Sequence, residues 1–157
     1  MAAAGRMETA MAQQPDPEPT SENLPAERFL ALKAAMLPRD TNPHGTIFGG
    51  VLLSYIDQAG AEGARNEITR LGLPEPLLVT VAMNAVEFLE PVYVGDVVSF
   101  WTQLRRIGRT SITVHVTVDT SRHGQTIKVT EADVTYVAVE QVGERRLPVP
   151  IRGASGD

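Results

Sequence analysis

The stretch NPHGTIFGGVLLSYIDQAG, Asn42 to Gly60, decides the fold of this 157-residue chain. Its glycines lead into a segment that is apolar on most sides, which is typical of a buried helix. Small or apolar residues recur in and just after this stretch at spacings of four, three and four, the period of an α-helix; they are Leu52, Ile56, Ala59 and Gly63. The spacing predicts one long helix from Gly49 to about Leu71, with a single carboxylate, Asp57, inside its most apolar part.

The segments around this helix have the pattern of β-strands. Phe29 to Pro38 is predicted as a first strand. Four long segments rich in β-branched or alternating residues follow the helix; they cover Leu77–Pro91, Asp96–Gly108, Thr110–Thr120 and Thr126–Glu140. Short connections such as IGRT and SRHG imply that neighbouring strands are antiparallel.

One helix cannot serve as the crossover of four strands, which excludes a doubly wound parallel sheet. We therefore predict an α+β fold in which an antiparallel sheet wraps around one long central helix. Such a sheet leaves an exposed edge strand, and exposed edges invite pairing with another strand. A homodimer with a continuous sheet would pair that edge.

Composition and charge narrow the classes of function. A hydrophobic content of 43% supports one packed domain, which we place at residues 26–143, with a disordered tail at 1–25 and a loose tail at 144–157. The net charge of -5 gives no indication of nucleic-acid binding. The absence of cysteine excludes a disulfide framework, a zinc–thiolate site and a cysteine nucleophile. No apolar run approaches the roughly 18 residues of a membrane span and the N-terminus lacks a signal-peptide core, so we expect a cytoplasmic protein without a membrane partner.

Four separated segments resemble those of the hotdog-fold acyl-CoA thioesterases. The run DTNPHGTIFGGVLLSYIDQAG is similar to the signature N-x-x-G-x-x-F-G-G-x(6)-D of that family. The segments AVEFLEPVYVGDVV, RRIGRTSITVHV and VTEADVTYVAV resemble its later strands and turns, in the family's order. The resemblance implies a hotdog fold, an obligate dimer as the active unit and often a trimer of dimers. It also implies hydrolysis of fatty acyl-CoA to a free acid and CoA without a metal or other cofactor.

The resemblance assigns chemistry to the helix and its approach. The helix begins at Gly49 and Gly50, where unpaired N–H groups carry partial positive charge and glycine allows a ligand to approach closely. The Gly50 N–H would polarise the thioester carbonyl. Asp57, two turns further on and expected to face the same cavity, would be general base or nucleophile. Asn42 would lie near that acid, often across the dimer interface.

Each of these residues also has a structural interpretation. The glycine pair could merely permit tight helix–sheet packing, and Asp57 could be a carboxylate bonded to a loop amide or an arginine. Asn42 precedes a proline, and this dipeptide favours a turn in any case.

Binding of CoA by an acidic protein needs local cations. The segment RRIGRTS supplies Arg105, Arg106 and Arg109 around a glycine turn, together with the hydroxyls of Thr110 and Ser111. Arginine suits phosphate, and the family uses this segment for the nucleotide end of CoA. The alternative is a solvated hairpin tip.

Other residues concern specificity. The acyl chain is expected to run past Tyr55, Met83 or Phe88, each of which could equally be core packing. Related thioesterases for aryl-CoA of the phenylacetyl type have H-G-G, whereas this chain has Phe48 before Gly49, which favours the acyl-CoA branch.

Two rivals remain: an aryl-CoA thioesterase and a non-catalytic acyl-CoA-binding protein. A hotdog dehydratase would need a histidine facing the helix, and none is expected. His44 is interpreted as a loop residue. His115 and His123 are interpreted as strand-face and turn residues without partners.

Overall fold

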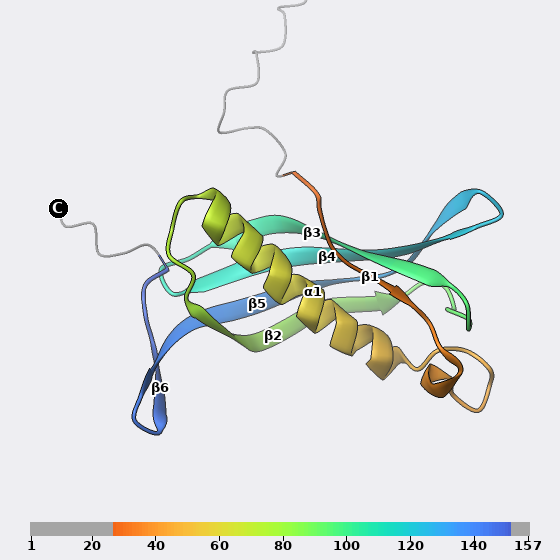
Figure 1. The fold of residues 1–157 in the computed structure, drawn as a ribbon, viewed down its shortest axis with the longest axis horizontal. Coiled ribbons are helices and arrows are strands. Elements are labelled where there is room, and N and C mark those ends of the chain that lie inside the picture. Colours follow the sequence, from red (N-terminus) through yellow and green to blue (C-terminus); the bar gives the residue numbers. More distant parts are fainter. Residues whose placement is uncertain (1–26, 152–157) are drawn as a thin grey trace, which may run out of the picture.

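The computed structural model describes residues 27–151, so the predicted N-terminal tail lies outside the described residues. One long helix lies across one face of a strongly curved sheet (Figure 1). The elements in chain order are β1 (Phe29–Ala35), the short 3-10 helix η1 (Pro38–Asp40), α1 (Gly49–Arg70), β2 (Leu77–Phe88), β3 (Val97–Ile107), β4 (Ser111–Arg122), β5 (Gln125–Val142) and β6 (Arg145–Pro148).

All pairings in the sheet are antiparallel. The strand order is β1-β3-β4-β5-β2, and β6 also pairs with β5. The predictions of a single helix, of the order of elements and of an antiparallel sheet are therefore confirmed. Strand β2 forms one edge of this order, and its second edge carries no strand from residues 27–151. No helix in the described part of the chain is long and apolar enough to cross a membrane.

The core lies between α1 and the inner face of the sheet. The alternation predicted for β4 is confirmed, because its even-numbered valines and Ile112 are fully buried while the residues between them are half-buried. Leu52, Ile56 and Ala59 of the helix belong to the same buried cluster. The long period-2 run on β4 thus gives the sheet one apolar face for the helix and one polar outer face.

Two glycines of α1 set how closely the helix packs on the sheet. A Cβ added to Gly60 would lie 2.3 Å from the hydroxyl oxygen of Tyr136, and one added to Gly63 would lie 2.2 Å from Oγ1 of Thr102. Only glycine leaves room for these buried side chains, which explains a choice that otherwise weakens a helix. The glycines are therefore packing residues.

The prediction of a loose tail at 144–157 is wrong for its described part. Residues 145–148 form β6 on β5, and Ile151 is 2% exposed and belongs to the core cluster. The end of β5 extends beyond β4 and offers free backbone groups, on which the chain folds back as a hairpin through Gly143 and Glu144. The composition of LPVPI does not reveal this pairing.

We expect Gly63→Ala to lower the free energy of unfolding by about 2 kcal/mol, because the new methyl group would overpack the Thr102 side chain. Urea unfolding measures this difference. Ser54→Ala, at an exposed position of the same helix, is the control and should be nearly neutral. A Gly63→Ala protein more stable than the parent would contradict the close contact.

Candidate active site

Asp57 is half-buried in the middle of α1 and is held from two strands. The Thr80 hydroxyl of β2 donates to Oδ1 of Asp57 at 2.6 Å. The Tyr136 hydroxyl of β5 donates to the main-chain carbonyl of Asp57 at 2.6 Å and lies 3.5 Å from Oδ1. One carboxylate oxygen is therefore fixed by Thr80, while Oδ2 makes no hydrogen bond within residues 27–151.

The carboxylate faces a cavity of about 490 Å³ between α1, β1 and β2. Thr80, Tyr136 and Arg65 line it, together with apolar side chains that include Leu32 and Leu78. Burial, and then the neighbouring Asp57 carboxylate, raise the pKa of Tyr136. Its hydroxyl therefore keeps its proton and remains a donor at neutral pH. Sequence reasoning missed Thr80 and Tyr136, because they lie 23 and 79 residues from Asp57.

The start of α1 presents free N–H groups. Phe48 occupies the N-cap and its side chain makes no capping bond. The N–H groups of Val51 and Leu52 both donate to the Phe48 carbonyl, whereas those of Gly49 and Gly50 have no acceptor within the described chain. Nothing lies within 4 Å of a Cβ built on Gly50. This helix end can receive a polar oxygen of a ligand.

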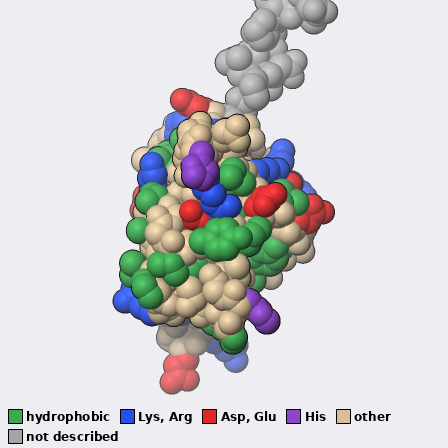
Figure 2. All heavy atoms as spheres, turned by 90° about the vertical axis from the view of Figure 1, so that its right-hand side faces the viewer, with side chains coloured by type: hydrophobic (Ala, Val, Ile, Leu, Met, Phe, Trp, Pro, Cys, Tyr) green, Lys and Arg blue, Asp and Glu red, His purple; other side chains and the backbone are tan. Residues whose placement is uncertain are grey.

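A second cavity of about 380 Å³ lies beside this helix start. It is lined mainly by apolar residues, among them Gly49, Leu52 and Phe88. The Phe88 ring lies 3.2 Å from a Cβ built on Gly49, so the glycine makes room for the ring. Figure 2, which faces the helix-start end of Figure 1, shows hydrophobic side chains gathered among charged ones. Exposed hydrophobic residues at this end include Leu37, Phe48, Phe88, Leu89, Tyr93 and Val94.

Gly50 and Asp57 do not face the same cavity within one chain, contrary to the sequence-based expectation. Asp57 lines the cavity beside β2 and Tyr136, whereas Gly49 lines the cavity beside Phe88. Seven helical residues span about 10 Å along the axis, so rotation to the same side does not bring the two groups together.

The other residues singled out in the sequence lie as follows. The side-chain oxygen Oδ1 of Asn42 accepts the N–H groups of His44 and Thr46, and its Nδ2 donates to Thr46 Oγ1, so its side chain shapes its own turn. Met83 is half-buried against the core cluster. The Tyr55 ring lies 5.6 Å from that of Phe100, which is a packing contact.

The hairpin between β3 and β4 carries three exposed arginine side chains. The side chains of Arg106 and Arg109 are exposed and have no polar partner among the described residues, whereas Arg105 lies 3.8 Å from Asp133. Thr110 and Ser111 are half-buried. Arg106 and Arg109 are thus available to an anionic ligand.

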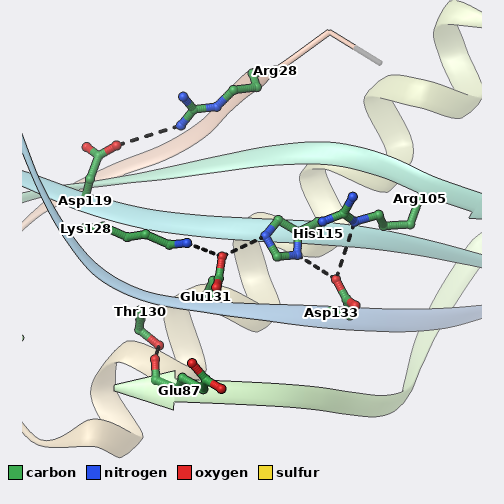
Figure 3. Close-up of polar contacts among 9 residues, drawn as sticks. All are labelled: Arg28, Glu87, Arg105, His115, Asp119, Lys128, Thr130, Glu131 and Asp133. Carbon is green, nitrogen blue, oxygen red and sulfur yellow. Dashed lines mark hydrogen bonds and ion pairs between the residues drawn. The ribbon is translucent and has the colours of Figure 1, made fainter. Parts of the chain in front are cut away.

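The interpretation of His115 as a residue without partners is wrong. On the outer face of β4 and β5, Nδ1 of His115 lies 2.6 Å from Asp133 and Nε2 lies 3.2 Å from Glu131 (Figure 3). Lys128 also contacts Glu131. The strand neighbours of His115 are buried against the helix side, so His115 itself points away from α1. The dehydratase alternative therefore still lacks its histidine.

No group of three or more His, Asp or Glu side chains within residues 27–151 is arranged to hold a metal ion.

The thioesterase superfamily model matches residues 44–127, which is more than half of the chain. The chain belongs to the thioesterase superfamily. The resemblance to hotdog thioesterases stated from the sequence is thereby confirmed.

Named relatives and solved structures agree with this family. The chain is 37% identical over 139 residues to the acyl-CoA thioester hydrolase YciA of Salmonella typhimurium, covering 85% of this chain and 98% of that protein. It is 42% identical to Cj0915, a hexameric hotdog-fold thioesterase of Campylobacter jejuni, with a TM-score of 0.65 over 76% of this chain and 89% of that one. It is 33% identical to HI0827, a hexameric broad-specificity acyl-coenzyme A thioesterase, with a TM-score of 0.67 over 85% and 88% of the two chains. The predicted hotdog fold is confirmed.

An ion pair fixes the loop that supports the helix start. Arg122 donates to both carboxylate oxygens of Asp96 at 3.3 and 2.5 Å, and also to the Pro91 carbonyl at 2.7 Å. The adjacent Val92 carbonyl accepts the Ile47 N–H at 2.8 Å, directly before α1. Burial pushes the pKa of Asp96 up, but the bonds from Arg122 and from the Tyr93 N–H outweigh it, so the pKa lies below its ordinary value.

Because that pKa is lowered in the folded protein, the stabilisation is present above about pH 4 and is lost as the pH falls through the folded value. Arg122→Gln leaves the half-buried Asp96 carboxylate without its charged partner, and we expect the free energy of unfolding to fall by about 2 kcal/mol at pH 7 and by less toward pH 3. Urea unfolding at both pH values measures it. Arg39→Gln is the control and should change little, because the Arg39 side chain is exposed and lies as far as 3.9 Å from Asp40. A deficit that is the same at both pH values would contradict this account.

Proposed function

We propose that this thioesterase-superfamily member hydrolyses acyl-CoA to a free carboxylic acid and CoA. The observation that carries the proposal is the pair of unpaired N–H groups at Gly49 and Gly50 together with the held carboxylate of Asp57. The names of the YciA relatives and of the broad-specificity structure support acyl-CoA as substrate. Phe48 in place of a histidine favours the acyl-CoA branch over aryl-CoA.

The reaction needs a polarised carbonyl and an attacking oxygen. The Gly50 N–H donates to the thioester oxygen as it gains negative charge in the transition state. Asp57 either takes a proton from the attacking water or attacks the carbonyl carbon itself. In both mechanisms the carbon–sulfur bond breaks and the CoA thiol is released. With Oδ1 held by Thr80, Oδ2 is the oxygen free to do this. The proposed steps use no metal ion and no cofactor.

The site is completed by a second copy of the chain. A catalytic base and an oxyanion donor must both lie within hydrogen-bond reach of one reacting group. Gly50 and Asp57 of one chain are about 10 Å apart along the helix. Gly50 does not line the cavity that Asp57 borders, and its neighbour Gly49 lines the other cavity. We therefore assign Gly50 of one protomer and Asp57 of its partner to one substrate. Asn42 would add its remaining Nδ2 hydrogen near the partner's acid, since its other bonds hold its own turn.

The partner copy would pair along β2. That strand carries exposed apolar side chains at Leu77, Val81 and Phe88, and its outer edge is unpaired in the described chain. Pairing two copies of this edge gives the continuous sheet of a dimer. The hexameric structures of relatives support a trimer of such dimers.

The CoA phosphates would bind to the hairpin between β3 and β4. Arg106 and Arg109 offer guanidinium groups that no described residue occupies, and the Thr110 and Ser111 hydroxyls are beside them. The acyl chain would enter the apolar cavity at Gly49, Leu52 and Phe88, while Met83 contributes packing behind it.

The direct test follows free-thiol release from butyryl-CoA and palmitoyl-CoA. We expect Asp57→Asn to lower kcat about 10²–10⁴-fold, because the base or nucleophile is removed. Size-exclusion chromatography of the Asp57→Asn protein should show the same oligomeric state as that of the unmodified protein. A folded Asp57→Asn enzyme of near-normal activity would refute the assignment, and tight binding of acyl-CoA without thiol release by the unmodified protein would favour the binding-protein alternative.

Hybrid assemblies test the two-copy site. Gly50→Pro removes the N–H donor in the first helical turn, where proline is tolerated and no side chain is displaced. Unfolding and co-refolding the inactive Gly50→Pro and Asp57→Asn chains together should recover activity on the order of a quarter of the unmodified enzyme's, because each hybrid dimer has one intact site. No recovery in confirmed hybrids would place both groups in one chain.

The phosphate site predicts a separate kinetic effect. Arg109→Glu should raise KM for acyl-CoA more than it lowers kcat, by about tenfold, because a charged hydrogen bond to phosphate is replaced by repulsion. Arg39→Glu, at an exposed position of η1, is the matched control for net charge. An unchanged KM would remove Arg109 from the site.

A further inference from the structure

The segment LPVPI, Leu147 to Ile151, returns along the sheet to the turn between β3 and β4, as the end of the coloured chain shows in Figure 1. The Val149 N–H donates to the Ala138 carbonyl at 2.9 Å, and the Ile151 N–H donates to the Arg109 carbonyl at 2.9 Å. The last described residues are thus bonded directly to the basic hairpin.

The sequence of this segment gives it N–H donors on one side only. Successive residues of a strand direct their N–H groups to opposite sides. Val149 and Ile151 both donate toward the sheet, and Pro148 and Pro150, which alternate with them, have no N–H to direct outward. Proline at these positions is suited to an edge that should pair on its inner side only.

The main chain of the hairpin is hydrogen-bonded at Arg109 and at its neighbour Thr110. The Thr110 carbonyl accepts the Ala138 N–H at 2.8 Å, while the Arg109 carbonyl is taken by Ile151. The Ile151 side chain is buried in the core cluster, so the N–H that donates to Arg109 is held in place. The Arg109 side chain, in contrast, is exposed and has no partner among residues 27–151. The backbone is fixed and the guanidinium is left for a ligand.

We propose that Leu147–Ile151, the C-terminal strap, positions Arg109 for the phosphates of CoA. This inference rests on the proposed function, in which that hairpin binds CoA. Arg109 is the binding residue, and Ile151 is a positioning residue that acts through it. A hairpin already fixed in its bound geometry loses less conformational freedom when the ligand arrives, which strengthens binding without any contact from the strap.

Two substrates separate this role from a general effect on the fold. Butyryl-CoA carries the phosphates, whereas S-butyryl-N-acetylcysteamine has the same thioester and lacks them. Ile151→Pro removes the N–H that bonds Arg109, and Ile151→Ala keeps this N–H but removes the buried anchor. We expect both variants to lower kcat/KM for butyryl-CoA about tenfold through KM, with little change for the truncated thioester. Pro150→Ala is the control, because it leaves both strap bonds in place, and should match the unmodified enzyme.

Equal losses of kcat/KM on both substrates, or no loss on either, would refute the proposed role of the strap. Should Ile151→Pro fail to fold by circular dichroism, the Ile151→Ala comparison decides alone by the same criterion. Arg109→Gln is measured in parallel. If this variant loses kcat/KM selectively for butyryl-CoA while the Ile151 variants do not, the positioning role of the strap is refuted and the phosphate site is supported. If Arg109→Gln leaves butyryl-CoA hydrolysis unchanged, the phosphate site is wrong and the strap with it.

Discussion

The close contact of α1 with the sheet at Gly60 and Gly63 is the constraint on which the remaining geometry depends. Because Gly60 has no side chain, the Tyr136 hydroxyl reaches past it to the Asp57 carbonyl, three residues earlier. The buried hydroxyl needs a hydrogen-bond acceptor, and this carbonyl supplies one. The same contact that brings helix and sheet together therefore fixes the backbone from which the carboxylate projects.

The helix also separates the two groups that the proposed chemistry needs together. Its first residue, Gly49, borders an apolar cavity near Phe88, while Asp57 borders a different cavity beside β2. A rigid helix cannot shorten the distance between them. On the proposed function, this separation is resolved by assembly, because the exposed edge of β2 lies beside Asp57 through Thr80. One surface would thus serve both dimerisation and catalysis.

Much of the fold could be predicted from local sequence patterns. The helix followed from its spacing of apolar residues, and β4 followed from strict alternation. Strand β2 was harder, because its pairing shifts register at Val81 and again near Ala85, where φ is +53°. Such bulges move the following residues to the other face, so alternation alone cannot say that Thr80 faces Asp57.

What the sequence missed has a common physical cause. Thr80 and Tyr136 reach Asp57 from the sheet to the helix, and the acids beside His115 reach that histidine across strands; the partners are separated by 16 to 79 residues in the sequence. The docking of Ile151 on Arg109 is likewise a long-range contact, made by the N–H of Ile151 in a proline-rich segment whose composition alone is typical of a loose tail. Local patterns predict the elements, whereas these contacts depend on the register in which the elements meet.

The bond from Thr80 to Asp57 links the orientation of the carboxylate to the state of an edge strand. Within the described chain, β2 is paired on one side only and is interrupted by two bulges, which are features of a strand with limited rigidity. Pairing its second edge with a partner would restrain it from both sides. Under the proposed assembly, a separated protomer would therefore lose more than the partner's residues. Its own Asp57 would be hydrogen-bonded to a β2 strand that is free to shift. The fixed orientation of the carboxylate therefore depends on association of the two copies.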